Sequence, residues 1–138
     1  MRRTAVVLGL GLAIGLAVGL IGDRVLIAQP APVRVSELLR TDLVGMEGKE
    51  LIVQRMEAGP GAGTGRHLHP GHEVAYILEG AGVLEIEGRL PSSQKAGEVA
   101  YIPARTVHEG RNPSPTAPLT LLVIRIHEKG QPVTIKAQ

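Results

Sequence analysis

The chain has 138 residues, which is enough for one ordinary domain and too few for two that each bury a substantial core. It has no cysteine, which excludes disulfides, thiolate metal ligands and a cysteine nucleophile. Of its 15 basic and 13 acidic residues, Arg2, Arg3, Arg24 and Asp23 lie in residues 1–28, so the remainder has 12 of each sign and lacks the Lys/Arg cluster that nucleic-acid binding needs.

Residues 1–28 have the pattern of a membrane-targeting segment. An uninterrupted run of apolar residues and glycine, Ala5 to Gly22, follows the two arginines near the start. We expect an apolar helix that is either a cleaved signal peptide, with the small residue Ala28 before the cut, or an uncleaved anchor. The folded domain is then exported to the periplasm or another extracytoplasmic space. It is soluble if the leader is removed and otherwise held in the membrane through residues 5–22 alone.

The rest of the chain predicts an all-β domain. Residues 29–33 contain proline and are expected to form a stiff linker into a domain spanning residues 34–138. The stretch VSELLRTDLVG favours either a short helical turn or an edge strand. Beyond it, short apolar runs separated by glycine and proline predict the strands of a sandwich or barrel. These runs are LIVQRMEA, EVAYILEG, GVLEIEG, EVAYIP, LTLLVIRIHE and PVTIKA.

Two of the runs also indicate which faces are buried. In GVLEIEG, apolar and acidic residues alternate, so Leu84 and Ile86 should face the core while the glutamates face water. The run Leu119 to Ile126 is more continuously apolar, which favours a strand covered on both faces. Its outer face is therefore a candidate subunit contact, and we expect a homodimer.

The stretch HLHPGHE holds three of the five histidines and a carboxylate around a Pro-Gly turn. On a strand, His67 and His69 point to one face, and a reversal at the turn can return Glu73 to the same face. His108 follows a second strand and proline-containing turn and is the best candidate for a further ligand. Imidazoles and a carboxylate suit a divalent transition metal, namely iron, manganese, nickel, copper or zinc.

Residues 61–80, GAGTGRHLHPGHEVAYILEG, resemble the first conserved motif of the cupin superfamily, in which glycine, His-x-His, glutamate and glycine recur at fixed spacing. Residues 97–112 resemble the second motif, which is matched at Gly97, Pro103, His108 and Asn112. The flanking stretches are similar to small exported cupins of the quercetin-dioxygenase-like type. This resemblance implies a small jelly-roll β-barrel of two antiparallel sheets, with metal bound inside it by His67, His69, Glu73 and His108.

The remaining candidate residues have less specific roles. Arg105 stands where the second cupin motif has a glycine, so it is either an exposed turn residue under strain or a cation bordering the pocket. His72 should point away from the ligand face, and the position of His127 at a strand end gives no reason to make it a ligand. Tyr76 and Tyr101, which are the only Phe, Tyr or Trp residues, are expected to pack inside an aliphatic barrel or to donate hydroxyls to its pocket.

Three functions remain open from the sequence. The first is a metal-dependent, dioxygenase-like oxidoreductase in which Glu73 ligates the metal or takes a proton from the substrate. The second is a non-catalytic periplasmic module that binds or senses a metal or small ligand. The third is an isomerase or lyase acting on a sugar or keto acid. Without Phe or Trp, the barrel suits a small oxygen-rich or aliphatic substrate better than a polyphenol.

Overall fold

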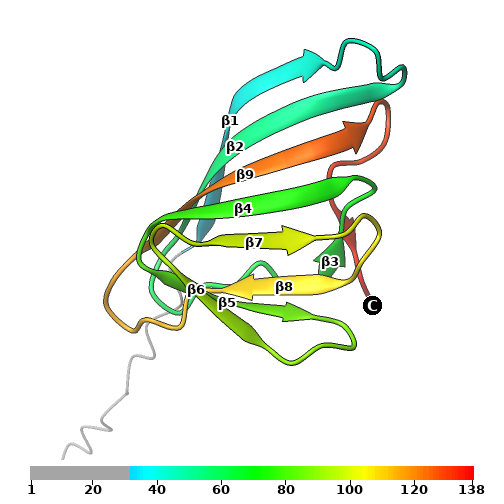
Figure 1. Ribbon diagram of the computed structural model, residues 1–138. Coiled ribbons are helices and arrows are strands. Elements are labelled where there is room, and N and C mark those ends of the chain that lie inside the picture. The colour runs from blue at the N-terminus through cyan, green and yellow to red at the C-terminus, as the bar shows by residue number, and fades with distance from the viewer. Residues whose placement is uncertain (1–31) are drawn as a thin grey trace, which may run out of the picture.

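The computed structural model describes residues 32–138, which form ten strands and no helix (Figure 1). The strands are β1 (Val33–Asp42), β2 (Lys49–Ala58), β3 (His67–Leu68), β4 (His72–Glu79), β5 (Ala81–Ile86), β6 (Ser92–Lys95), β7 (Val99–Ile102), β8 (His108–Arg111), β9 (Leu119–Glu128) and β10 (Ile135–Lys136). The leader helix expected over residues 1–28 lies outside the described part. Within residues 32–138, nothing helical is long and apolar enough to cross a membrane.

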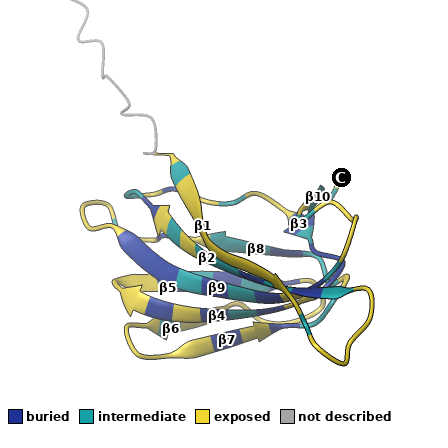
Figure 2. Cartoon of the chain, turned by 90° about the horizontal axis from the view of Figure 1, so that it is seen from above, coloured by how far each residue is buried: buried dark blue, intermediate teal, exposed yellow. Residues whose placement is uncertain are grey.

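The strands form two five-stranded antiparallel sheets that pack face to face. The first sheet has the order β1-β2-β9-β4-β7, and the second has the order β10-β3-β8-β5-β6. Five of the six predicted apolar runs coincide with β2, β4, β5, β7 and β9, and the sixth ends in the short strand β10. The stretch that was ambiguous between a helical turn and an edge strand is the edge strand β1, which is exposed along almost its whole length (Figure 2). The all-β prediction with two antiparallel sheets is confirmed.

Strand β9 is the centre of the first sheet. It pairs with β2 from Lys49 opposite Glu128 to Ala58 opposite Leu119, and it pairs with β4 on its other side. Only one of its faces is buried within the chain, because Ile126 on the opposite face is 39% exposed. The expectation that this strand is covered on both faces is therefore not met by a single chain.

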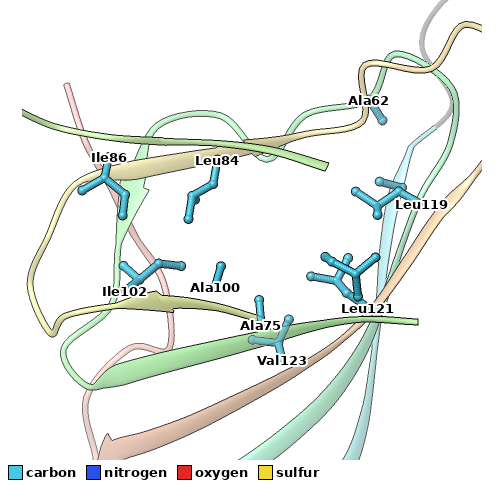
Figure 3. Packing of buried hydrophobic residues seen from close by; sticks show 11 residues of the cluster. Ala62, Ala75, Leu84, Ile86, Ala100, Ile102, Leu119, Leu121 and Val123 are labelled. Atoms are coloured by element: carbon cyan, nitrogen blue, oxygen red, sulfur yellow. The ribbon is translucent and has the colours of Figure 1, made fainter. Parts of the chain in front are cut away.

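The core lies between the two sheets and is aliphatic (Figure 3). Leu84 and Ile86 of β5 face Ala100 and Ile102 of β7 across the sandwich, as the alternation in their strands predicts. The full cluster is Ala58, Ala62, Ala75, Ile77, Leu84, Ile86, Ala100, Ile102, Leu119, Leu121 and Val123. Many of these side chains are small, which leaves space between the sheets.

The two tyrosines are not part of this core. Tyr76 alternates with inward Ala75 on β4, and Tyr101 alternates with inward Ala100 on β7, so both phenol rings lie on the outer face of the first sheet. Their exposures are 39% and 52%. The expectation that they pack inside the barrel or line its pocket is wrong, because the period of two places them on the other side of the sheet.

Candidate metal centre

The predicted metal-binding residues come together at one end of the sandwich. His67 begins β3 and lies directly opposite His108, the first residue of β8, in the second sheet. Pro70 and Gly71 then carry the chain across to the first sheet, where Glu73 faces back toward the histidines from β4. The turn therefore joins two sheets, whereas the sequence had suggested a reversal between neighbouring strands.

Close packing of this crossing requires glycine. A Cβ atom added to Gly71 would lie 2.0 Å from the carbonyl oxygen of Ile126 and 2.8 Å from the Cα atom of His127. No side chain can be accommodated there without displacing β9. The Pro-Gly pair thus sets how near the histidine segment lies to the first sheet.

The three histidines have the same hydrogen-bond pattern. Nδ1 of His67 donates to the carbonyl of Gly65 at 2.7 Å, and Nδ1 of His108 donates to that of Thr106 at 2.9 Å. Nδ1 of His69 donates to the carbonyl of Val133 at 2.5 Å. A ring whose Nδ1 carries the proton presents the lone pair of Nε2, so the backbone selects the same tautomer three times.

The three side chains converge on one point. Their ligand nitrogens all lie within 4.8 Å of one another, and the Nε2 atoms of His67 and His69 are 3.1 Å apart. Burial is the main influence that lowers the pKa of His67 and of His108, so both rings are neutral at pH 7. Two facing lone pairs at this distance require a proton or a metal ion between them. The donor set therefore fits a divalent metal with nitrogen ligands.

Glu73 lies beside this group and is held by a buried arginine. Its Oε2 accepts a hydrogen bond from Nε of Arg125 at 2.7 Å and lies 2.9 Å from Nε2 of His69. Glu73 and Arg125 are 5% and 3% exposed. Burial by itself raises the pKa of Glu73, but the hydrogen bond to His69 and the charges of Arg125 and His69 outweigh it and lower this pKa to about 2. Glu73 is thus ionised at neutral pH, and its service as a metal ligand stays a prediction.

Sequence reasoning missed Arg125. It lies within the apolar run of β9 at an inward position, two residues after buried Val123. Besides Glu73, its guanidinium contacts Oε1 of Gln54 at 2.5 Å. The sequence did contain a signal for this residue, namely a charged side chain at an inward-facing position of an otherwise apolar strand. Such a side chain is rarely buried without a partner, so it indicates a buried acidic or polar group nearby.

The other candidate residues lie outside the histidine group. The Arg105 side chain is exposed and lies 3.8 Å from Glu128, so it is a turn residue that does not border the cavity described below. Its φ of 59° retains the left-handed conformation that glycine favours, and its amide donates to the carbonyl of His69 at 2.7 Å. His72 is exposed and bonds to the Tyr101 hydroxyl at 2.8 Å. His127 is buried, with its Nε2 donating to the carbonyl of Gln131.

A cavity of about 70 Å³ adjoins the histidines between the two sheets. Its polar end is formed by His67, His108, Glu73 and Arg125, and most of the remaining wall is aliphatic. A small molecule in this cavity would touch both the proposed metal site and the ionised carboxylate. The arrangement therefore combines a metal-binding group, a buried ion pair and an apolar chamber.

Comparisons with known proteins identify similar sequences and folds. Residues 54–125, more than half of the chain, match the family model described as Cupin domain. A cupin-like protein from Thermotoga maritima is 29% identical, with a TM-score of 0.60 over 72% of each chain. The DMSP lyase DddQ from Ruegeria pomeroyi is 22% identical, with a TM-score of 0.56 over 63% of this chain and 43% of that chain.

Oxalate decarboxylase from Bacillus subtilis is a further structural neighbour, 21% identical with a TM-score of 0.56 over 64% of this chain and 24% of that chain. The chain thus spans less than half of the lyase and of the decarboxylase, and the likeness to these two is one of fold alone. None of the curated proteins matches the sequence.

Proposed function

The chain belongs to the cupin family, and from this premise we propose that it is a metal-dependent, dioxygenase-like oxidoreductase acting on a small molecule. The convergence of three buried imidazoles carries the proposal, because each Nδ1 is bonded to a backbone carbonyl and the ligand nitrogens of His67, His69 and His108 lie within 4.8 Å of one another. Iron, manganese, nickel, copper and zinc are the candidates. Such an ion supplies Lewis acidity and, for the redox-active metals, electron transfer.

Glu73 is proposed to be the fourth ligand or the proton acceptor. It lines the cavity and is ionised at neutral pH. A carboxylate with a pKa of about 2 is a weak base, so it can take a proton only from a strongly acidified substrate group. Replacing Glu73 with Gln should reduce turnover more than metal content if proton transfer is its role. Equal loss of both would assign it to metal binding instead.

The metal site is tested by elemental analysis of protein purified without added metal or a histidine tag. The wild type should carry close to one metal per chain, and a His67→Ala, His108→Ala double variant should carry none. His72→Ala is the matched control, because this histidine is exposed and lies outside the buried group. An equal metal content in all three proteins would contradict the proposal.

Oxygen uptake separates the possible reactions. A dioxygenase-like enzyme should consume oxygen in proportion to the product formed from a small chelating substrate. Turnover without oxygen uptake would favour the sugar or keto-acid isomerase or lyase. A metal-loaded protein that binds ligands without turnover would be a periplasmic binding or sensing module.

We also propose that two copies pair through the outer face of the first sheet. One row of neighbouring side chains crosses this sheet on the face opposite the core. It consists of Tyr101 on β7, Val74 on β4, Ile124 on β9 and Val53 on β2. This row is an apolar surface that a second copy would cover. Analytical ultracentrifugation should give a dimer for the wild type and a monomer for Ile124→Lys. A wild-type monomer at all concentrations would refute the pairing.

Export is proposed from residues 1–28 alone. Cell fractionation should place the protein outside the cytoplasm, and mass spectrometry of the purified chain should show whether cleavage follows Ala28. A cytoplasmic full-length protein would contradict the proposal.

A further inference from the structure

The cavity beside the histidines has one charged end and a largely aliphatic body. Its body is bounded by Leu84 from the second sheet and by Ala75, Ala100 and Leu121 from the first, as the close-up view shows (Figure 3). Thr64, Gln94 and Arg111 also line it, and these three are partly or largely exposed, so the cavity meets solvent on their side. A ligand can therefore enter past polar groups and place an apolar portion among the core side chains.

Small residues create the space. Ala75 and Ala100 are direct partners across β4 and β7, and both are buried on the inner face of the first sheet. A larger side chain at either position would extend toward Leu84 across the sandwich. The volume of the cavity is thus set by two alanines at paired positions.

The volume limits what the apolar part of a ligand can be. About 70 Å³ is available, which is less than half the volume of an engineered apolar cavity of about 150 Å³ that binds benzene. The chamber therefore takes a chain of roughly three or four non-hydrogen atoms and rejects an aromatic ring. A charged tail is also excluded from the part bounded by Ala75, Ala100 and Leu121, because these aliphatic side chains offer it no hydrogen bonds.

The charge at the histidine end of the cavity limits which polar group of a ligand, here called its head group, can bind there. Glu73 and Arg125 form a buried ion pair without net charge, with Oε2 of Glu73 2.7 Å from Nε of Arg125. Histidines that ligate a metal do so as uncharged imidazoles. A divalent ion at the histidines would thus leave two positive charges uncompensated in a buried site. An anionic oxygen donor is the head group that compensates them.

We propose that the ligand is a short-chain aliphatic acid, with its anionic head at the three histidines and a tail of about three or four carbons in the alanine-lined chamber. The proposal deepens the metal-dependent function above and rests on it. It predicts that the affinity for an acid depends on the length of its aliphatic tail, which a metal centre alone would not produce.

The test uses alkyl hydroxamates as anionic, oxygen-donating probes on the full-length protein loaded with Zn²⁺. Calorimetry should show the affinity rising about fourfold per methylene from acetohydroxamate to butyrohydroxamate. It should then fall at least tenfold for hexanohydroxamate and for benzohydroxamate. Zinc stoichiometry is measured first by elemental analysis, so that loss of the metal and loss of selectivity are read separately.

Two variants alter the chamber and one serves as a control. Ala100→Val should weaken butyrohydroxamate at least tenfold and leave acetohydroxamate unchanged, while Leu121→Ala should improve benzohydroxamate. Val99→Ala is the matched control, because its side chain lies on the outer face next to Ala100 and should not change the series. The wild-type series decides the question even if a variant fails to fold.

A zinc-loaded protein with equal affinity for all chain lengths would overturn the substrate class and leave the metal centre intact. A protein that takes up no zinc would overturn the metal centre and this proposal with it.

Discussion

Replacing Arg125 with Met should lower the free energy of unfolding of the metal-free protein by about 3 to 5 kcal/mol at pH 7. Glu73 and Arg125 are both almost fully buried and joined at 2.7 Å, so the substitution leaves a carboxylate in the core without its cation. A loss of this size is a large part of the stability of a small domain, which is typically about 5 to 15 kcal/mol.

The pKa of Glu73 gives the scale of all the interactions that stabilise its ionised form, of which the hydrogen bond to His69 is the largest and the charge of Arg125 the next. It falls from 4.5 to about 2 on folding, which corresponds to about 3 kcal/mol in favour of the ionised form. Because the folded-state pKa is the lower one, this contribution is fully present above pH 4.5 and is lost as the pH falls toward 2. Without Arg125, burial is offset less and the pKa of Glu73 rises. The cost of the substitution should therefore shrink below pH 4.5, where the carboxylate can be protonated.

Urea unfolding at pH 7 and pH 3.5, in the presence of a chelator, measures both effects. Arg55→Met is the matched control, since Arg55 pairs with Glu57 at 2.8 Å on β2 but both side chains are nearly half exposed. It should cost less than about 1 kcal/mol at either pH. The reasoning is refuted if Arg125→Met costs no more than this control, or if its cost is the same at both pH values.

Three further substitutions test the framework of the site. Gly71→Ala should destabilise the protein by about 3 kcal/mol or more, as measured by urea unfolding, because the new Cβ meets the backbone of Ile126; a loss below 1 kcal/mol would contradict the close approach. Asn112→Ala should cost about 2 to 3 kcal/mol, because its buried amide donates to backbone carbonyls; a neutral effect on the melting temperature would show that water replaces it. Arg105→Gly should raise stability by about 0.5 to 1 kcal/mol by removing left-handed strain, while Arg105→Ala, which keeps the strain, should not.

Much of the fold is predictable because its strands obey simple periodicity. Alternation places Leu84 and Ile86 inward, and the spacing of His67 and His69 indicates a shared ligand face. The tyrosines were misplaced because aromatic side chains are usually buried, and this expectation was given more weight than the phase of their strands. Residue type alone does not say which face of a strand meets the core.

The parts of the site that sequence could not supply depend on tertiary contacts. Arg125 becomes a site residue only because β9 lies next to β4, which brings it opposite Glu73. The carbonyls that fix the imidazole tautomers belong to loop residues of no special type, such as Val133. No local pattern distinguishes such a carbonyl from any other, since every residue has one.

The order of synthesis has a consequence for how this site is assembled. His69 is fixed by Val133, which follows it by 64 residues, and Glu73 is fixed by Arg125, which follows it by 52. At translation rates of about 5 to 20 residues per second, the histidine segment waits roughly 3 to 13 s for its last backbone partner. During that interval His69 lacks the carbonyl that orients its ring, whereas Gly65, the partner of His67, has already been synthesised. The complete set of oriented imidazoles, which the proposed metal site requires, therefore forms only after nearly the whole chain has been synthesised.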